Sequence, residues 1–146
     1  MTSVAAGLAV LAGFAGSVQV AVMGRFGQRI GVVEALAFAT GVQLVLAATV
    51  LVAARQGVGG LGGAFRSPPW MWAGGLMGLL VVFSITFAQP RLGATTTIGI
   101  LIAGQLAMGA VIDRFGLFGV GQIALTWPRL LGIVLLGAGA ALSLSR

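Results

Sequence analysis

The sequence predicts an all-α integral membrane protein with about five transmembrane helices. Of its 146 residues, 59% are hydrophobic and 7% are charged, whereas a soluble domain carries about 25% charged residues. So few charges cannot cover a water-facing surface, and the apolar runs are close to the ~20 residues that a helix needs to cross a bilayer. We therefore expect one transmembrane domain over residues 1–146, embedded in a lipid bilayer.

The ionisable residues argue against several other classes of protein. The net charge is +6, but the basic residues are scattered along the chain, and nucleic-acid binding needs a basic patch. The chain has no cysteine and no histidine, which excludes disulfides and histidine-based metal or acid–base sites. No Ser-His-Asp set, phosphate loop or metal-ligand spacing is present, so we predict no enzyme, no catalytic residue, no metal and no cofactor.

Two spans are predicted in the first third of the chain, over residues 4–23 and 32–54. No basic residue precedes the first apolar run, so we interpret it as a permanent span rather than a cleaved signal peptide. Arg25 and Arg29 are expected to frame a short loop between the two spans.

A glycine-rich segment over residues 56–69, closed by Pro-Pro, is predicted to be a linker that cannot hold a stable helix. A tight reversal is expected at residues 89–91, and residues 115–127 are too short to cross and predict an interfacial or re-entrant connector. The remaining spans are predicted over residues 70–88, 92–112 and 128–144.

The arginines predict the orientation of the chain. With five spans, the loops on the side of the N-terminus hold Arg55, Arg66, Arg114 and Arg129, and the opposite side holds Arg25, Arg29, Arg91 and Arg146. The positive-inside rule needs an excess on one side, and here the two sides are equal. We therefore predict that the protein inserts in both orientations and pairs as an antiparallel homodimer.

Small residues predict where helices approach closely. Gly74 and Gly78 form a GxxxG motif in the third span, and Gly99, Ala103 and Ala107 form a stripe in the fourth. Packing inside one chain is the favoured interpretation of each stripe, and a dimer interface is the alternative.

Three amides lie within spans, where buried polar groups are expensive and usually face a helix bundle's interior. Gln19, Gln43 and Gln105 are therefore candidates for lining a substrate path. The alternative, equally favoured for any single glutamine, is a hydrogen bond to a neighbouring helix.

The two acids, Glu34 and Asp113, could couple transport or serve the structure. Glu34 is placed in the first turn of its span, where the helix dipole favours an acid, so capping and pairing with Arg25 or Arg29 is the favoured interpretation. Asp113 is predicted at a helix C-terminus, against the dipole, and we expect it to cap the following connector or to pair with an arginine.

A cluster of three threonines lies in the first turn of the fourth span, at Thr95, Thr96 and Thr97. Their hydroxyls could bond back to their own helix or supply contacts at a cavity mouth.

The run GGLMGLLVVFSITFAQPRLGATTTIGILIAGQLAMGAVIDRFGLFG, followed by RLLGIVLLGAGAAL, resembles the YdcZ-like family of small bacterial inner-membrane proteins, in the drug/metabolite transporter superfamily. The most specific part is Gly104-Gln105 followed by the IDRFG motif at residues 112–116. The resemblance implies a multi-pass inner-membrane protein of about five spans that assembles from two inverted halves and moves small metabolites or drugs. The distantly related small multidrug exporters rely on an acid in the first helix, and this first helix has none, which argues against proton-coupled export of organic cations.

Taken together, these observations predict a small-molecule transporter that works by alternating access, with a site at the interface of two inverted protomers lined by Gln19, Gln43 and Gln105. The alternatives are a passive channel of dual topology and an accessory membrane subunit that transports nothing.

Overall fold

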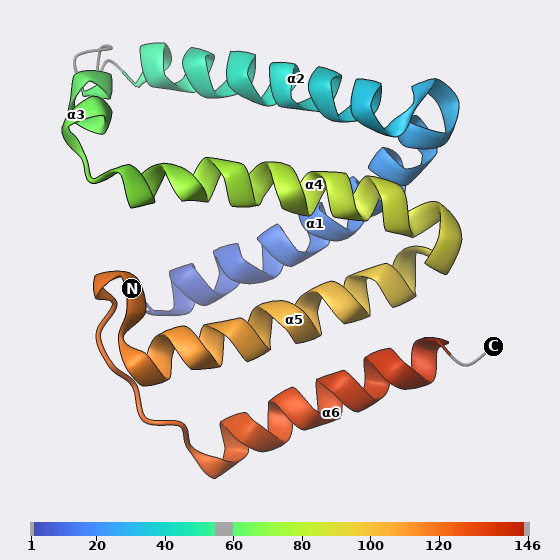
Figure 1. The fold of residues 1–146 in the computed structure, drawn as a ribbon, viewed down its shortest axis with the longest axis vertical. Coiled ribbons are helices and arrows are strands. Elements are labelled where there is room, and N and C mark those ends of the chain that lie inside the picture. The colour runs from blue at the N-terminus through green and yellow to red at the C-terminus, as the bar shows by residue number, and fades with distance from the viewer. Residues whose placement is uncertain (1, 55–59, 145–146) are drawn as a thin grey trace. The chain divides into compact units, whose positions relative to one another are not determined.

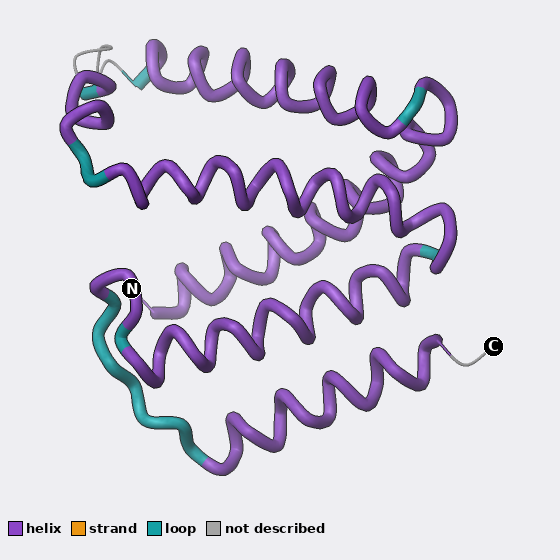
Figure 2. The backbone as a smooth tube through the Cα atoms, viewed as in Figure 1, coloured by secondary structure: helices purple, strands orange, loops and turns teal. Residues whose placement is uncertain are grey.

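The computed structural model describes residues 2–54 and 60–144, and the elements in those ranges are helical, with no strand (Figure 1, Figure 2). The long helices are α1 (Thr2–Ile30), α2 (Val32–Ala53), α4 (Ala73–Leu92), α5 (Ala94–Phe115) and α6 (Trp127–Leu144). The short elements are the helix α3 (Leu61–Arg66) and the 3-10 helices η1 (Pro69–Trp72) and η2 (Leu117–Gly119).

Five helices of the described chain are long and apolar enough to cross a membrane. They cover Ser3–Ile30, Val32–Ala53, Pro69–Leu92, Ala94–Phe115 and Trp127–Leu144. Most of their large apolar side chains are exposed on the surface of the chain, which suits a lipid environment. The predicted all-helical fold with five spans is confirmed, while the predicted single domain, homodimer and dual topology stay predictions.

The first helix is longer than predicted. It continues past Met23 to Ile30, so Arg25 and Arg29 lie within α1 and not in a loop. Arginine is a good helix former, and the end of an apolar run does not break backbone hydrogen bonds. The helix ends where Gly31 adopts a φ of +104°, a conformation that side chains disfavour.

The predicted reversal at residues 89–91 is also wrong, because Gln89, Pro90 and Arg91 lie inside α4. Proline fixes a helix-compatible φ and removes one backbone N–H, which helix ends and membrane helices tolerate. The chain reverses instead at Gly93, whose φ is +83°. The next helix therefore starts at Ala94, two residues later than predicted.

The charged pair after residue 112 does not end α5, which runs on to Phe115. Gly116 ends it in the left-handed conformation, with a φ of +62°, and its N–H donates to the carbonyl of Ile112. After η2, the residues up to Trp127 carry no regular structure, as Figure 2 shows. This agrees with the prediction of a connector too short to cross.

The predicted linker contains more helix than expected. Residues 55–59 lie outside the described residues, but α3 and η1 follow them. The indole N–H of Trp72 donates to the carbonyl of Ala64 at 3.1 Å, and its ring meets that of Phe65 edge-on. These contacts hold a helical turn in a sequence that glycine alone would leave unstructured.

The chain divides into two compact units. The first unit comprises the described residues up to Val20 and those from Arg91 onward, and includes α5 and α6. The second unit runs from Ala21 to Pro90 and includes the end of α1, α2 and most of α4.

Candidate functional site

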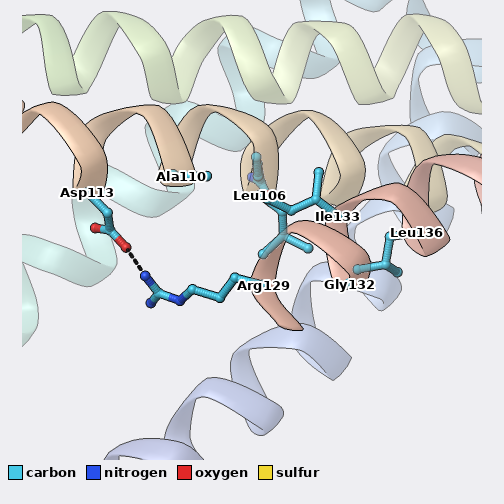
Figure 3. Close-up of a pocket in the computed structure, with 9 residues that line it drawn as sticks. Leu106, Ala110, Asp113, Arg129, Gly132, Ile133 and Leu136 are labelled. Atoms are coloured by element: carbon cyan, nitrogen blue, oxygen red, sulfur yellow. Dashed lines mark hydrogen bonds and ion pairs between the residues drawn. The ribbon is translucent and has the colours of Figure 1, made fainter. Parts of the chain in front are cut away.

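A hollow of about 340 Å³ lies between α5 and α6 in the first unit (Figure 3). Its lining, which we call the α5–α6 groove, consists of Gln105, Leu106, Gly109, Ala110, Asp113, Arg129, Gly132, Ile133 and Leu136. Its volume is within the range of small-molecule sites.

The groove exists because small residues occupy its walls. The lining positions recur every three or four residues on both helices, so each helix contributes one face. A Cβ added to Gly109 or Gly132 would meet no atom within 4 Å. The missing side chains at these two glycines leave the space open.

One end of the α5–α6 pair is closed by direct packing. A Cβ at Gly99 would lie 3.6 Å from the Cα and Cβ of Ala140, so the helices touch there. Nearby, the hydroxyl of Thr96 donates to the Ser143 carbonyl at 3.0 Å and lies 2.6 Å from the Ser143 hydroxyl. Because the Thr96 proton is directed to the carbonyl, the Ser143 hydroxyl can donate in return.

The other end is bridged by an ion pair between the two helices. Nη1 of Arg129, in the first turn of α6, lies 3.1 Å from Oδ2 of Asp113, in the last turn of α5 (Figure 3). The side chains of Arg129 and Asp113 are 46% and 26% exposed, so both stay accessible. The backbone carbonyl of Asp113 also accepts from the N–H of Ile123 at 2.8 Å, which ties the connector to α5.

The groove is therefore apolar between two polar ends. Gln105 is the polar side chain at one end, and the ion pair occupies the other. Gln105 and Asp113 are eight residues apart, which is about 12 Å along a helix. This distance is close to half of a bilayer's hydrocarbon thickness of ~30 Å.

Of the three predicted glutamines, the structure places Gln105 in this groove. Gln19 is half-buried on α1 in the first unit, and Gln43 is exposed on α2 in the second. Neither belongs to the lining of the α5–α6 groove. Their role in a substrate path stays a prediction.

Glu34 lies in the first turn of α2, as predicted, and is exposed. Among the described residues it forms no ion pair with Arg25 or Arg29 and no capping hydrogen bond. Its carboxylate lies over Gly31, where a Cβ would collide with it. The N–H of Gly31 is already used, because it donates to the carbonyl of Gly27 at 3.0 Å.

The predicted packing stripes have different environments. Gly99 contacts α6, whereas Ala103 is half-buried and Ala107 is exposed. A Cβ at Gly74 or Gly78 would meet no atom within 4 Å. Within the second unit, these two glycines are therefore open.

The three threonines at the start of α5 have different environments and hydrogen-bond partners. Thr97 is buried, and its hydroxyl donates to the carbonyl of Gly93, the residue directly before its own helix. Thr96 is also buried but bonds across to α6, while Thr95 is exposed. The cluster therefore secures the closed end of the α5–α6 pair.

Sequence reasoning overlooked two polar residues. Counting Arg129 only for its side of the membrane misses its partner, because charged side chains at the level of a span pair with one another. The sequence predicts a turn at Gln89, yet its side-chain oxygen is buried in the second unit with no hydrogen-bond partner. The signal for Gln89 was that a proline near a helix end does not require a turn.

Among the residues that the structure describes, no three of His, Cys, Asp and Glu gather in a way that could hold a metal ion. The polar side chains that line the groove are one amide, one carboxylate and one guanidinium.

Comparison with known proteins shows two similarities. The sequence matches the family described as "Putative inner membrane exporter, YdcZ" over residues 4–142. It is 39% identical over 88 residues to the inner membrane protein YdcZ of Escherichia coli (strain K12). That match covers 59% of this chain and 58% of the relative's length. No solved structure matches the chain.

Proposed function

We propose that this chain, which belongs to the family described as "Putative inner membrane exporter, YdcZ", is a multi-pass inner-membrane transporter of the drug/metabolite type that exports a small molecule. The observation that supports this most is the α5–α6 groove. It is large enough for a small molecule, it is mostly apolar, and it carries polar groups at its two ends. This is the composition expected of a ligand site with a few orienting groups.

The proposed mechanism is alternating access by two inverted protomers. The equal numbers of arginines at the two predicted membrane sides support an inverted pair. In such a pair, the ion pair of one protomer's groove lies toward one side of the membrane, and that of the other protomer's groove lies toward the opposite side. The site near the midplane opens to each side in turn. We retain Gln19 and Gln43, with Gln105, as the residues that face the substrate near the midplane.

The open face at Gly74 and Gly78 is the proposed contact with the second protomer. Glycines four residues apart let two backbones approach closely, and within the second unit a Cβ at either position would meet no atom within 4 Å. A small reporter fused to the C-terminus should be found on both sides of the membrane in one population of cells. A reporter on one side alone would contradict the antiparallel pair.

Transport is tested without knowing the substrate. Liposomes carrying the purified protein are loaded with a small-molecule extract of bacterial cells, and mass spectrometry identifies compounds that leave. We expect saturable release of a defined subset of compounds. Release that rises linearly without saturation would indicate a channel, and no release at all would indicate an accessory subunit.

The position of the site is tested by filling the groove. Gly109→Leu places a side chain into the open space, whereas Gly104→Leu places the same side chain on an exposed part of α5 outside the lining. Gly109→Leu should abolish most of the saturable release, and Gly104→Leu should retain it. Equal release by both variants would show that the substrate does not use this groove.

A further inference from the structure

We infer that the α5–α6 groove selects small zwitterions with an apolar body, the chemistry of an α-amino acid with an apolar side chain. The inference rests on the proposed function, because it names the substrate class of the proposed site. It is carried by the charge, the remaining hydrogen-bonding capacity and the lining of the groove.

The charges that line the groove balance. Asp113 and Arg129 are its two charged residues, and they neutralise each other. Arg114, the next residue after Asp113, is exposed and does not belong to the lining. A ligand with a single charge would be attracted by one member of the pair and repelled by the other member at a similar distance. A zwitterion can pair with both members without separating them.

The ion pair has hydrogen-bonding capacity to spare. One contact joins the two side chains, from Nη1 of Arg129 to Oδ2 of Asp113. A guanidinium has five N–H donors and a carboxylate has a second oxygen, so donors remain for an anion and an acceptor remains for an ammonium group. With 46% of Arg129 and 26% of Asp113 exposed, both remaining groups can be reached.

The spacing of the two charges suits a compact zwitterion. Opposite charges in the pair are 3.1 Å apart. An α-amino acid holds its ammonium and carboxylate at a comparable separation, because a single carbon joins them. Such a ligand can place its carboxylate on Arg129 and its ammonium on Asp113, so that four charges alternate in sign.

The rest of the groove suits an apolar body. Beyond the ion pair, the walls next to the space left by Gly109 and Gly132 are Ala110, Ile133 and Leu136 (Figure 3). These side chains offer no hydrogen bonds, and burial of an apolar group against them is favourable. A purely polar zwitterion would therefore gain the charge contacts without the apolar contacts.

Binding is tested with four probes on the full-length protein in detergent. Leucine has both charges and an apolar body, 4-methylpentanoate lacks the ammonium, 3-methylbutylamine lacks the carboxylate, and glycine lacks the body. Thermal unfolding at rising probe concentrations gives the affinity, because a ligand of the folded state raises the melting temperature. We expect leucine to bind about tenfold or more tightly than either singly charged probe, because each of these lacks a charge-assisted hydrogen bond. Leucine should also bind more tightly than glycine, because glycine lacks the apolar contacts. Equal shifts from leucine and any one of the other three probes would overturn the inference.

Two charge variants give a second measurement that does not depend on the absolute affinity. In Asp113→Asn only the arginine remains charged, so 4-methylpentanoate should bind at least as tightly as leucine. In Arg129→Gln only the acid remains charged, so 3-methylbutylamine should bind at least as tightly as leucine. The double variant Asp113→Arg with Arg129→Asp retains a neutral pair and should retain the preference for leucine. Unchanged preferences in both single variants would overturn the inference, even if their stability falls.

The liposome experiment separates this inference from the proposed function. Release of compounds from the extract with no apolar zwitterion among them would overturn the inference and leave the proposed function intact. A selective leucine shift with no release of any compound would overturn the proposed function and support the selectivity of the groove.

Discussion

The α5–α6 pair in the first unit and the α1–α4 contact in the second unit hold polar groups in opposite ways. Between α5 and α6, polar residues face each other at the two ends, as Thr96 with Ser143 and Asp113 with Arg129, and a hollow lies between them. Between α1 and α4, the polar side chain of Gln89 lies directly against a glycine, Gly24, and its oxygen has no partner.

The difference shows what glycine does in each place. At the α1–α4 contact, a Cβ at Gly27 would lie 2.6 Å from Cγ2 of the fully buried Thr86, so the glycine allows close packing. In the α5–α6 groove, a Cβ at Gly109 would meet nothing. Glycine therefore allows close packing at the α1–α4 contact and leaves open space in the α5–α6 groove.

The largest expected effect comes from forcing the close contact apart. Gly27→Leu should destabilise the protein by about 1–3 kcal/mol, because the side chain must displace Thr86. Gly13→Leu is the matched control on the same helix, since a Cβ there meets no atom within 4 Å. The measurement is the melting temperature in detergent, and equal values for the two variants would contradict the close packing of α1 on α4.

A smaller effect is expected at the closed end of the α5–α6 pair. Thr96→Val removes the hydrogen bonds to Ser143 and should cost about 1 kcal/mol, near the upper part of the range for bonds between membrane helices. Thr95→Val, at the exposed neighbouring position, should change the melting temperature little. A larger loss in Thr95→Val than in Thr96→Val would show that α5 faces α6 differently.

The ion pair at the other end should contribute less to stability than to selectivity. Arg129→Gln should cost about 0.5 kcal/mol, because the pair is half-exposed and water competes for both charges. The control is Arg114→Gln, which removes an exposed arginine that forms no ion pair within the described chain. The difference between the two variants should shrink at high salt, and a difference that grows with salt would contradict an electrostatic origin.

The smallest effect is expected in the groove itself. Gly109→Ala should leave stability within about 0.5 kcal/mol of the original protein, because the added methyl group occupies open space. Gly27→Ala, compared in the same melting experiment, should be clearly less stable. A marked loss in Gly109→Ala would mean that another part of the assembly fills the groove.

The number of spans could be predicted from the sequence, because hydrophobicity and length are local properties. The residues at which the spans end could not be predicted in this way. Charges and proline often end helices, which predicts loops at Arg25, Arg29, Gln89 and Pro90, yet the structure keeps all four residues helical. Gly31 and Gly93, which make the turns, carry a positive φ that the surrounding sequence does not reveal.

The candidate site was predictable in part. Gln105 and Asp113 lie on one helix eight residues apart, and sequence reasoning singled out both. Arg129 was not among the predicted site residues, because its position beside Asp113 depends on how the connector of residues 116–126 returns the chain to α5. For the same reason the sequence could not separate Gln105, which lines the groove, from Gln19 and Gln43, which do not.

The sequence by itself therefore determined that this protein is helical, that it has five apolar spans and which few polar residues those spans contain. The tertiary structure decided which of these residues share a space. The free energy of placing a helix in lipid depends on the apolar residues of that helix alone. The shape of a groove depends instead on how two helices are rotated about their axes. That rotation is set by contacts such as Gly99 on Ala140 and Thr96 on Ser143, between residues more than forty positions apart.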